Sequence, residues 1–274
     1  MKKRFIILID FSEYSSNLIK YAMDWSKELN TEILLFHQTI IIAPALADRE
    51  ARQEIINVTN YEAIQKLKAL AHSLIPNIMN VSYRVSENPL QISLSEVLAE
   101  PFENLIFVGL KGTGILKKVF LGSVAVQVIK KTQNIIVAMP KEINSFSHEK
   151  IFIAINEKEP LNITGLNKFL QFFGNENTHI TFFYLAKLNE NTIAIEKQLQ
   201  QLAEMFADRF ITDIAIYKGQ NRLEDIKKVI NNNIDELLVI QKGSRYFTDQ
   251  FFNRFIINEL VYAGQTPLII LPEK

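Results

Sequence analysis

The chain contains the same succession of short apolar runs twice, and this internal repeat constrains its fold more than any other feature. Residues 105–140 align with residues 237–272 without a gap, at an offset of 132 positions. The runs of the first copy are residues 5–9, 32–37, 81–85, 104–108 and 134–139, and those of the second are residues 151–155, 180–185, 211–217, 237–240 and 267–271. Apolar runs of this length, separated by helical stretches, are typical of buried parallel strands.

The repeat predicts an α/β fold with two tandem doubly wound sheets, each of five parallel strands flanked by helices and joined by right-handed crossovers. Residues 141–149 are polar and lack periodicity, so they are interpreted as a linker. The predicted domains are residues 1–142 and 149–274. The second copy is shorter by 14 residues, mostly between its second and third strands.

A glycine-rich stretch follows the fourth apolar run of the first copy. Four of the nine glycines lie at positions 109, 112, 114 and 122, and a helix ending in two lysines is expected after them. Glycines let backbone amides approach a ligand closely, and a helix N-terminus presents unpaired N–H groups. The arrangement suits a phosphate group, although neither GxxxxGK[ST] nor GxGxxG is present.

Gly109, Gly112, Gly122 and Ser123 form the pattern G-x2-G-x9-G-S, which resembles the nucleotide-binding motif of the universal stress protein family. The first copy is similar to a full universal stress domain and the second to a diverged one. The resemblance implies the strand order 3-2-1-4-5, with ATP and Mg²⁺ across the carboxyl ends of the first and fourth strands. A doubly wound sheet by itself also predicts a ligand there, because its strand order reverses at that point.

The resemblance implies a role for each matching residue. Asp10, after the first apolar run, would contact the adenosine end of the nucleotide or help to hold the metal ion. The alternative is an aspartate that caps the next helix, for which Ser12, Ser15 and Ser16 also offer N-caps. His37 is interpreted as a packing residue at a strand end. The other residues assigned to the site are Leu8, Ile9 and Gln38 around the base, and Gly109, Lys111, Gly112, Gly122, Ser123 and Val124 around the phosphates.

The second copy departs from the motif at every one of its positions. Side chains stand where backbone would have to approach phosphate, so this copy is predicted not to bind ATP. It also has Asn156 in the place of Asp10. The residues aligned with Gly109, Gly112, Gly122 and Ser123 are Gln241, Ser244, Arg254 and Phe255.

Composition excludes several other classes of function. Thirty basic and thirty acidic residues balance, so no charged surface for nucleic acid or for a membrane is expected. The absence of cysteine excludes disulfides and thiolate chemistry. No apolar run approaches the ~20 residues of a membrane span. The N-terminal run ends at Asp10 after five residues, too short for a signal peptide. A cytoplasmic protein is expected.

The predicted function is that of an ATP-binding universal stress protein, a regulatory or stress-response binding module with little or no hydrolysis. No hydrolytic constellation is evident, but whether the chain is an enzyme stays open. One alternative is a slow nucleotide hydrolase of the related adenine-binding α/β folds, although the loop DFSEYSS after the first strand lacks the glycines of such enzymes. The other is a scaffold that binds no nucleotide.

The two fifth strands, residues 135–139 and 268–271, are apolar and would invite aggregation if they remained exposed sheet edges. They are therefore expected to lie against each other and make the chain an internal pseudo-dimer, with a homodimer as a further option.

Overall fold

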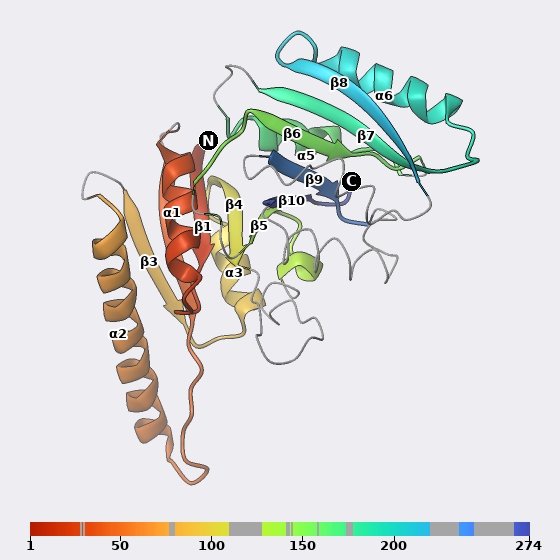
Figure 1. Ribbon diagram of the computed structural model, residues 1–274. Helices are drawn as coiled ribbons and strands as arrows, with labels where there is room; N and C mark the ends of the chain where they lie inside the picture. The colour runs from red at the N-terminus through yellow and green to blue at the C-terminus, as the bar shows by residue number, and fades with distance from the viewer. Residues whose placement is uncertain are drawn as a thin grey trace.

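The computed structural model describes residues 1–27, 29, 31–76, 80–109, 128–140, 143, 145–157, 159–173, 178–219, 236–243 and 266–274. Within these ranges the chain forms one ten-stranded sheet with helices on both faces (Figure 1). The strands are β1 (Lys2–Leu8), β2 (Thr31–Gln38), β3 (Val81–Ser86), β4 (Phe102–Gly109), β5 (Ile135–Met139), β6 (Lys150–Ala154), β7 (His179–Lys187), β8 (Ile211–Gly219), β9 (Glu236–Gln241) and β10 (Leu268–Leu271). The helices are α1 (Ser15–Ser26), α2 (Arg49–Leu74), α3 (Leu90–Leu98), α5 (Ile163–Leu170) and α6 (Ile193–Phe206), and residues 128–131 are also helical.

The strands lie in the order β3-β2-β1-β4-β5-β10-β9-β6-β7-β8. When the strands are numbered within each copy, both groups of five have the predicted order 3-2-1-4-5. All neighbouring strands are parallel except β5 and β10, which are antiparallel. The α/β class and the strand order of the sequence prediction are confirmed, and the two five-stranded sheets meet edge to edge to form one.

The contact between β5 and β10 is the pairing that their apolar sequences predict. Both strands are buried along their whole length, so neither is left as an exposed apolar edge. In the antiparallel register Val137 faces Ile269, flanked by the pairs Ala138–Leu268 and Ile136–Ile270.

The sequence of β1 shows why its apolar run is continuous. Phe5 and Ile7 belong to one core cluster, and Ile6 and Leu8 belong to the other. Successive side chains of a strand point to opposite faces, so a central strand covered on both sides needs an apolar residue at every position.

The helices divide between the two faces of the sheet. α1, α2, α5 and α6 contribute to the larger core cluster, whereas α3 and residues 128–129 contribute to the smaller one. In the 26-residue helix α2 the buried residues, Ala63, Leu67 and Ala71, all lie in the second half. Its first half extends past the edge of the sheet (Figure 1).

The one tryptophan of the chain lies where the two copies meet. Trp25 of α1 is fully buried, and its ring stacks on the rings of Phe146 and Phe173, with ring centroids 4.4 and 5.2 Å away. Its Nε1 donates a hydrogen bond to the carbonyl oxygen of Phe172 at 2.7 Å. The N–H of Phe146 donates to Asp24 Oδ2 at 3.0 Å. Residues of both copies therefore share one core.

Candidate functional site

The strand order of the first copy reverses at β1 and β4. β1 pairs with β2 on one side and with β4 on the other, where Ile7 lies opposite Phe107. Ile9 and Gly109 are therefore level at the carboxyl ends of the two strands. After β1 the chain enters α1 on one face, whereas residues 128–129, which follow β4 in the chain, pack on the other face. Connections that diverge in this way leave a crevice in which doubly wound proteins bind ligands.

Gly109 ends β4, and among the described residues only one atom lies near its missing side chain. A Cβ added to this residue would meet, among the atoms of the described residues, only Leu18 Cδ2 at 4.0 Å. A glycine has no side chain that would keep a ligand away from its backbone. The geometry is compatible with the phosphate contact assigned to Gly109 from the sequence.

The chain leaves β1 through a strained turn. Phe11 has a φ of 57°, and every other non-glycine residue in the described ranges has a negative φ. Such a conformation costs roughly 1–2 kcal/mol for an L-residue, and backbone strain of this kind concentrates at functional sites. Sequence reasoning missed this turn, because a phenylalanine carries no signal for positive φ.

Asp10 is exposed at the start of this turn and supports it. Its Oδ1 accepts hydrogen bonds from the backbone N–H of Ser12 at 2.9 Å and from the hydroxyl of Ser15 at 3.2 Å. The N-cap of α1 is Tyr14, which makes no side-chain capping bond. None of the three serines that the sequence suggests is the N-cap residue, and two of them donate to Asp10, Ser12 through its backbone N–H and Ser15 through its hydroxyl. The carboxylate therefore has a local structural role near the beginning of α1. A test of its ligand role has to separate that role from this one.

His37 supports the same turn from the end of β2. Its Nδ1 lies 2.7 Å from the carbonyl oxygen of Ile9, and because a carbonyl can only accept, Nδ1 carries the proton. Its ring also contacts the ring of Phe11, with centroids 4.5 Å apart. Burial lowers the pKa of His37, against the opposing effects of the bond to Ile9 and the charge of Asp10. These contacts agree with the packing role inferred from the sequence.

The side chain of Gln38 turns away from β1. Its Nε2 donates to the carbonyl oxygen of Asn88 at 3.1 Å. The next residue, Thr39, is buried and donates through its hydroxyl to Asn60 Oδ1 at 2.7 Å. Asn60 donates in turn to the carboxylate of Glu87 at 2.8 Å, and this bond lowers the pKa of Glu87. Any contact of Gln38 with a base would therefore use its backbone.

The other predicted site residues, Lys111, Gly112, Gly122, Ser123 and Val124, lie outside the described residues.

The end of the helix expected after the glycine motif is described from residue 128. Its last turn is capped by the second copy: Nζ of Lys242 donates to the carbonyl oxygens of Lys130 and Thr132 at 2.9 and 3.3 Å. A cation in this position is favourable for a helix C-terminus.

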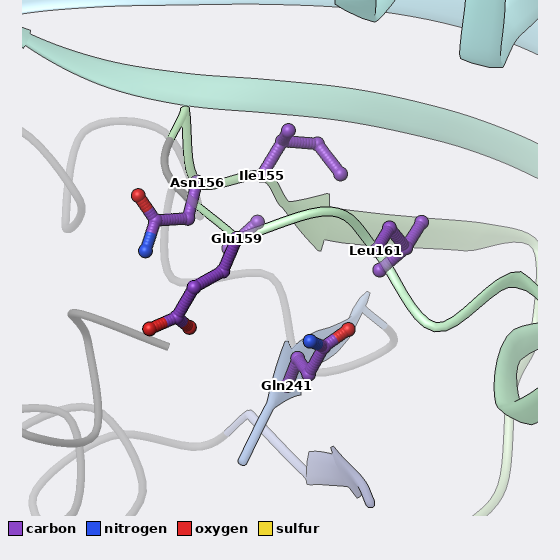
Figure 2. Close-up of a pocket in the computed structure, with 6 residues that line it drawn as sticks. Ile155, Asn156, Glu159, Leu161 and Gln241 are labelled. Carbon is purple, nitrogen blue, oxygen red and sulfur yellow. The ribbon is translucent and has the colours of Figure 1, made fainter. Parts of the chain in front are cut away.

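The carboxyl ends of β6 and β9 are the corresponding place in the second copy. The N–H of Ile155 donates to the carbonyl oxygen of Phe183 at 2.8 Å, as the N–H of Ile9 does to Phe36 at the same distance. A cavity of about 10 Å³ remains between the two strand ends, room for about one water molecule. Figure 2 shows this cavity, which is lined by Ala154, Ile155, Asn156, Glu159, Leu161 and Gln241.

Among the described residues, no three histidine, aspartate or glutamate side chains gather in an arrangement that could hold a metal ion with protein ligands alone. A Mg²⁺ ion at Asp10 would take its remaining ligands from phosphate oxygens and water, as Mg²⁺ commonly does. In the described part of the chain, no helix combines the length and the apolar character needed to cross a membrane.

The strand order and the crevice at β1 and β4 place the chain among the doubly wound α/β proteins. Within this class, residues 1–137 match the universal stress protein family. The chain belongs to that family. No curated protein sequence matches it.

Solved structures share the fold over both copies. A universal stress protein from Archaeoglobus fulgidus is 16% identical, with a TM-score of 0.71 over 99% of this chain and 98% of that one. The cytoplasmic domain of a prokaryotic cation chloride cotransporter is 10% identical, with a TM-score of 0.59 over 100% of this chain and 96% of that one. At such low identity these similarities concern the fold alone.

Proposed function

We propose that the first copy binds ATP in the crevice at the carboxyl ends of β1 and β4. The protein then acts as a regulatory or stress-response binding module with little or no hydrolysis. The observation that carries this proposal is the glycine without a side chain at the end of β4, Gly109, level with the strained turn after β1, at the point where the strand order reverses. Family membership and the motif G-x2-G-x9-G-S support the choice of a nucleotide.

In this proposal the nucleotide spans the two strand ends. Leu8, Ile9 and the backbone of Gln38 surround the base, and Asp10 binds the adenosine end or the metal ion. The residues of the glycine motif, with Lys111 and Val124, bind the phosphates. Mg²⁺ would supply charge neutralisation between phosphate oxygens when it is bound.

Residues 1–142 are proposed as the nucleotide-binding domain and residues 149–274 as a diverged domain that does not bind ATP. The antiparallel pairing of β5 with β10 supports a description of the chain as a pseudo-dimer of these two domains. A cytoplasmic location belongs to the same proposal, on the ground of family membership.

Calorimetric titration of the full chain with ATP and Mg²⁺ tests this proposal. We expect one ATP per wild-type chain and none for Gly122→Arg, which introduces the residue that the second copy has at the aligned position. An arginine side chain would fill the phosphate volume, and its attraction for phosphate, about 1 kcal/mol when solvated, is too weak to compensate. Ser95→Arg, on an exposed position of α3, is the matched control for the added charge.

The same titration separates the alternatives. A wild type that binds no ATP would indicate a scaffold, and two sites per chain would show that both copies bind. Steady phosphate release under excess ATP would identify a hydrolase.

A further inference from the structure

The second copy closes its own crevice with protein groups, and Gln241 is central to this closure. Gln241 ends β9 at the position that aligns with Gly109, and it is 8% exposed. Its Oε1 accepts a hydrogen bond from the backbone N–H of Asn162 at 2.6 Å, and its Nε2 donates to the carbonyl oxygen of Pro160 at 3.3 Å. The carboxamide therefore joins the end of β9 to the segment that connects β6 with α5.

Asn162 continues these bonds toward the C-terminus. Its Oδ1 accepts from the N–H of Gly165 at 2.8 Å and caps α5. Its Nδ2 donates to the carbonyl oxygens of Pro272 and Glu273 at 3.1 and 3.2 Å. One connected set of hydrogen bonds thus links the end of β9, the start of α5 and the segment after β10.

At the corresponding point of the first copy, the end of β4 has no side chain that could make these hydrogen bonds. The backbone bonds of Ile9 and Ile155 are the same, so the two strand ends are equivalent. Gly109, however, has no side chain, and the turn after β1 is held by Asp10 and His37 instead. At this level the second copy has the hydrogen-bonded side chain of Gln241 where the first copy has a glycine.

We propose that Gln241 is the residue that excludes nucleotide from the second copy, because its carboxamide occupies and hydrogen-bonds the place that a ligand takes in the first. The closure stands on the observed hydrogen bonds. The statement about nucleotide rests on the proposed ATP site of the first copy.

Hydrogen exchange tests the closure directly. Gln241→Met has a similar length but lacks both polar groups, so the N–H of Asn162 loses its acceptor. Its exchange in the full chain should accelerate by about tenfold, as expected for the loss of a buried hydrogen bond. The N–H of Ile9, bonded in the first copy, should exchange at an unchanged rate. An equal exchange rate of the Asn162 N–H in the wild type and in Gln241→Met would overturn the closure.

Gly109→Gln tests the exclusion of nucleotide, with ATP and Mg²⁺ titrated into the full chain. We expect a loss of ATP affinity of more than about tenfold, whereas Glu103→Gln, at the other end of β4, should bind as the wild type does. Equal ATP binding by Gly109→Gln and wild type would overturn the role of Gln241 and leave the ATP site standing. A wild type that does not bind ATP would instead overturn the proposed function and the role of Gln241 with it.

Discussion

At the scale of single residues, Asp10 has a structural role that is visible and a ligand role that is proposed. Oδ1 of its carboxylate accepts hydrogen bonds from the N–H of Ser12 and from the hydroxyl of Ser15. An amide at the same position retains an oxygen that can accept, but it has no charge. Two substitutions can therefore separate the support of the turn from the binding of a nucleotide or its metal ion.

Asp10→Ala should lower the free energy of unfolding by about 1 kcal/mol, as for the loss of a helix-capping side chain, and Asp10→Asn by less than about 0.5 kcal/mol. Both should weaken ATP binding by roughly 1–3 kcal/mol, because both lose the charged acceptor. Urea unfolding and calorimetry measure the two quantities. If Asp10→Asn binds ATP as tightly as the wild type, the carboxylate serves the turn alone.

His37 gives stability a pH dependence of defined sign. Its lowered pKa means that the unfolded chain, with a histidine pKa near 6.5, binds the proton more tightly than the folded protein. The contribution of neutral His37 to the free energy of unfolding is complete above about pH 6.5. It is lost as the pH falls from there through the lower pKa that His37 has in the folded protein.

His37→Gln should lose less stability than the wild type between about pH 7.5 and pH 5.5, since glutamine can donate to Ile9 but does not titrate. Urea midpoints at the two pH values measure the difference. Carboxylates such as Glu87 and Glu100, whose pKa values are lowered by hydrogen bonds, lose their contributions only below about pH 4.5, outside this window. Equal losses of stability in the wild type and in His37→Gln between these pH values would contradict the assignment of the pH dependence to His37.

The positions of the strand-end residues could be predicted, whereas their partners could not. Asp10, Gln38 and Gly109 follow apolar runs, so their place at the carboxyl edge of the sheet could be predicted from the alternation of strands and helices. The bond from Asn162 to Gln241 spans 79 residues and depends on backbone geometry that no local pattern encodes.

At the scale of elements, the strands could be predicted because central strands are apolar on both faces. The pairing of β5 with β10 could also be predicted, since two apolar edges within one chain need cover. The polar linker was less predictable: Phe146, within the stretch expected to connect two domains, stacks on Trp25 in the core. A single aromatic residue in a polar stretch gives no periodic signal.

The double variant Val137→Cys/Ile269→Cys should form an intrachain disulfide. Directly opposed residues of antiparallel strands lie about 4.5–5.5 Å apart at Cα, within the range that disulfides accept. Both positions are fully buried, so oxidation should accompany refolding, and thiol counting after denaturation measures it.

The chain has no cysteine of its own, so the background is clean. Ile135→Cys/Ile269→Cys is the matched control, because diagonal neighbours lie about 7–8 Å apart and should remain reduced. Oxidation of the control in preference to Val137→Cys/Ile269→Cys would refute the register.

At the scale of the whole molecule, the larger core cluster contains α1 and α2 of the first copy together with α5 and α6 of the second. Trp25 belongs to this cluster and stacks on two phenylalanines that follow β5 in the chain. Removing its side chain, as in Trp25→Ala, should destabilise the protein by roughly 3–5 kcal/mol.

We therefore expect the chain to unfold as one unit. Urea transitions followed by Trp25 fluorescence, which reports the junction, and by far-ultraviolet circular dichroism, which reports all helices and strands, should coincide. Two separated transitions would show that the shared sheet and core do not couple the copies.

The junction of β5 with β10 also has a consequence for how this chain can change over generations. In an assembly of identical subunits every substitution appears on both sides of the interface, so a change that closes one crevice closes both. Fusion into a single chain removes that symmetry. A glutamine could arise at position 241 of the second copy while Gly109 of the first copy stayed unchanged. The second copy could then lose ligand binding and still cover the sheet edge of the first.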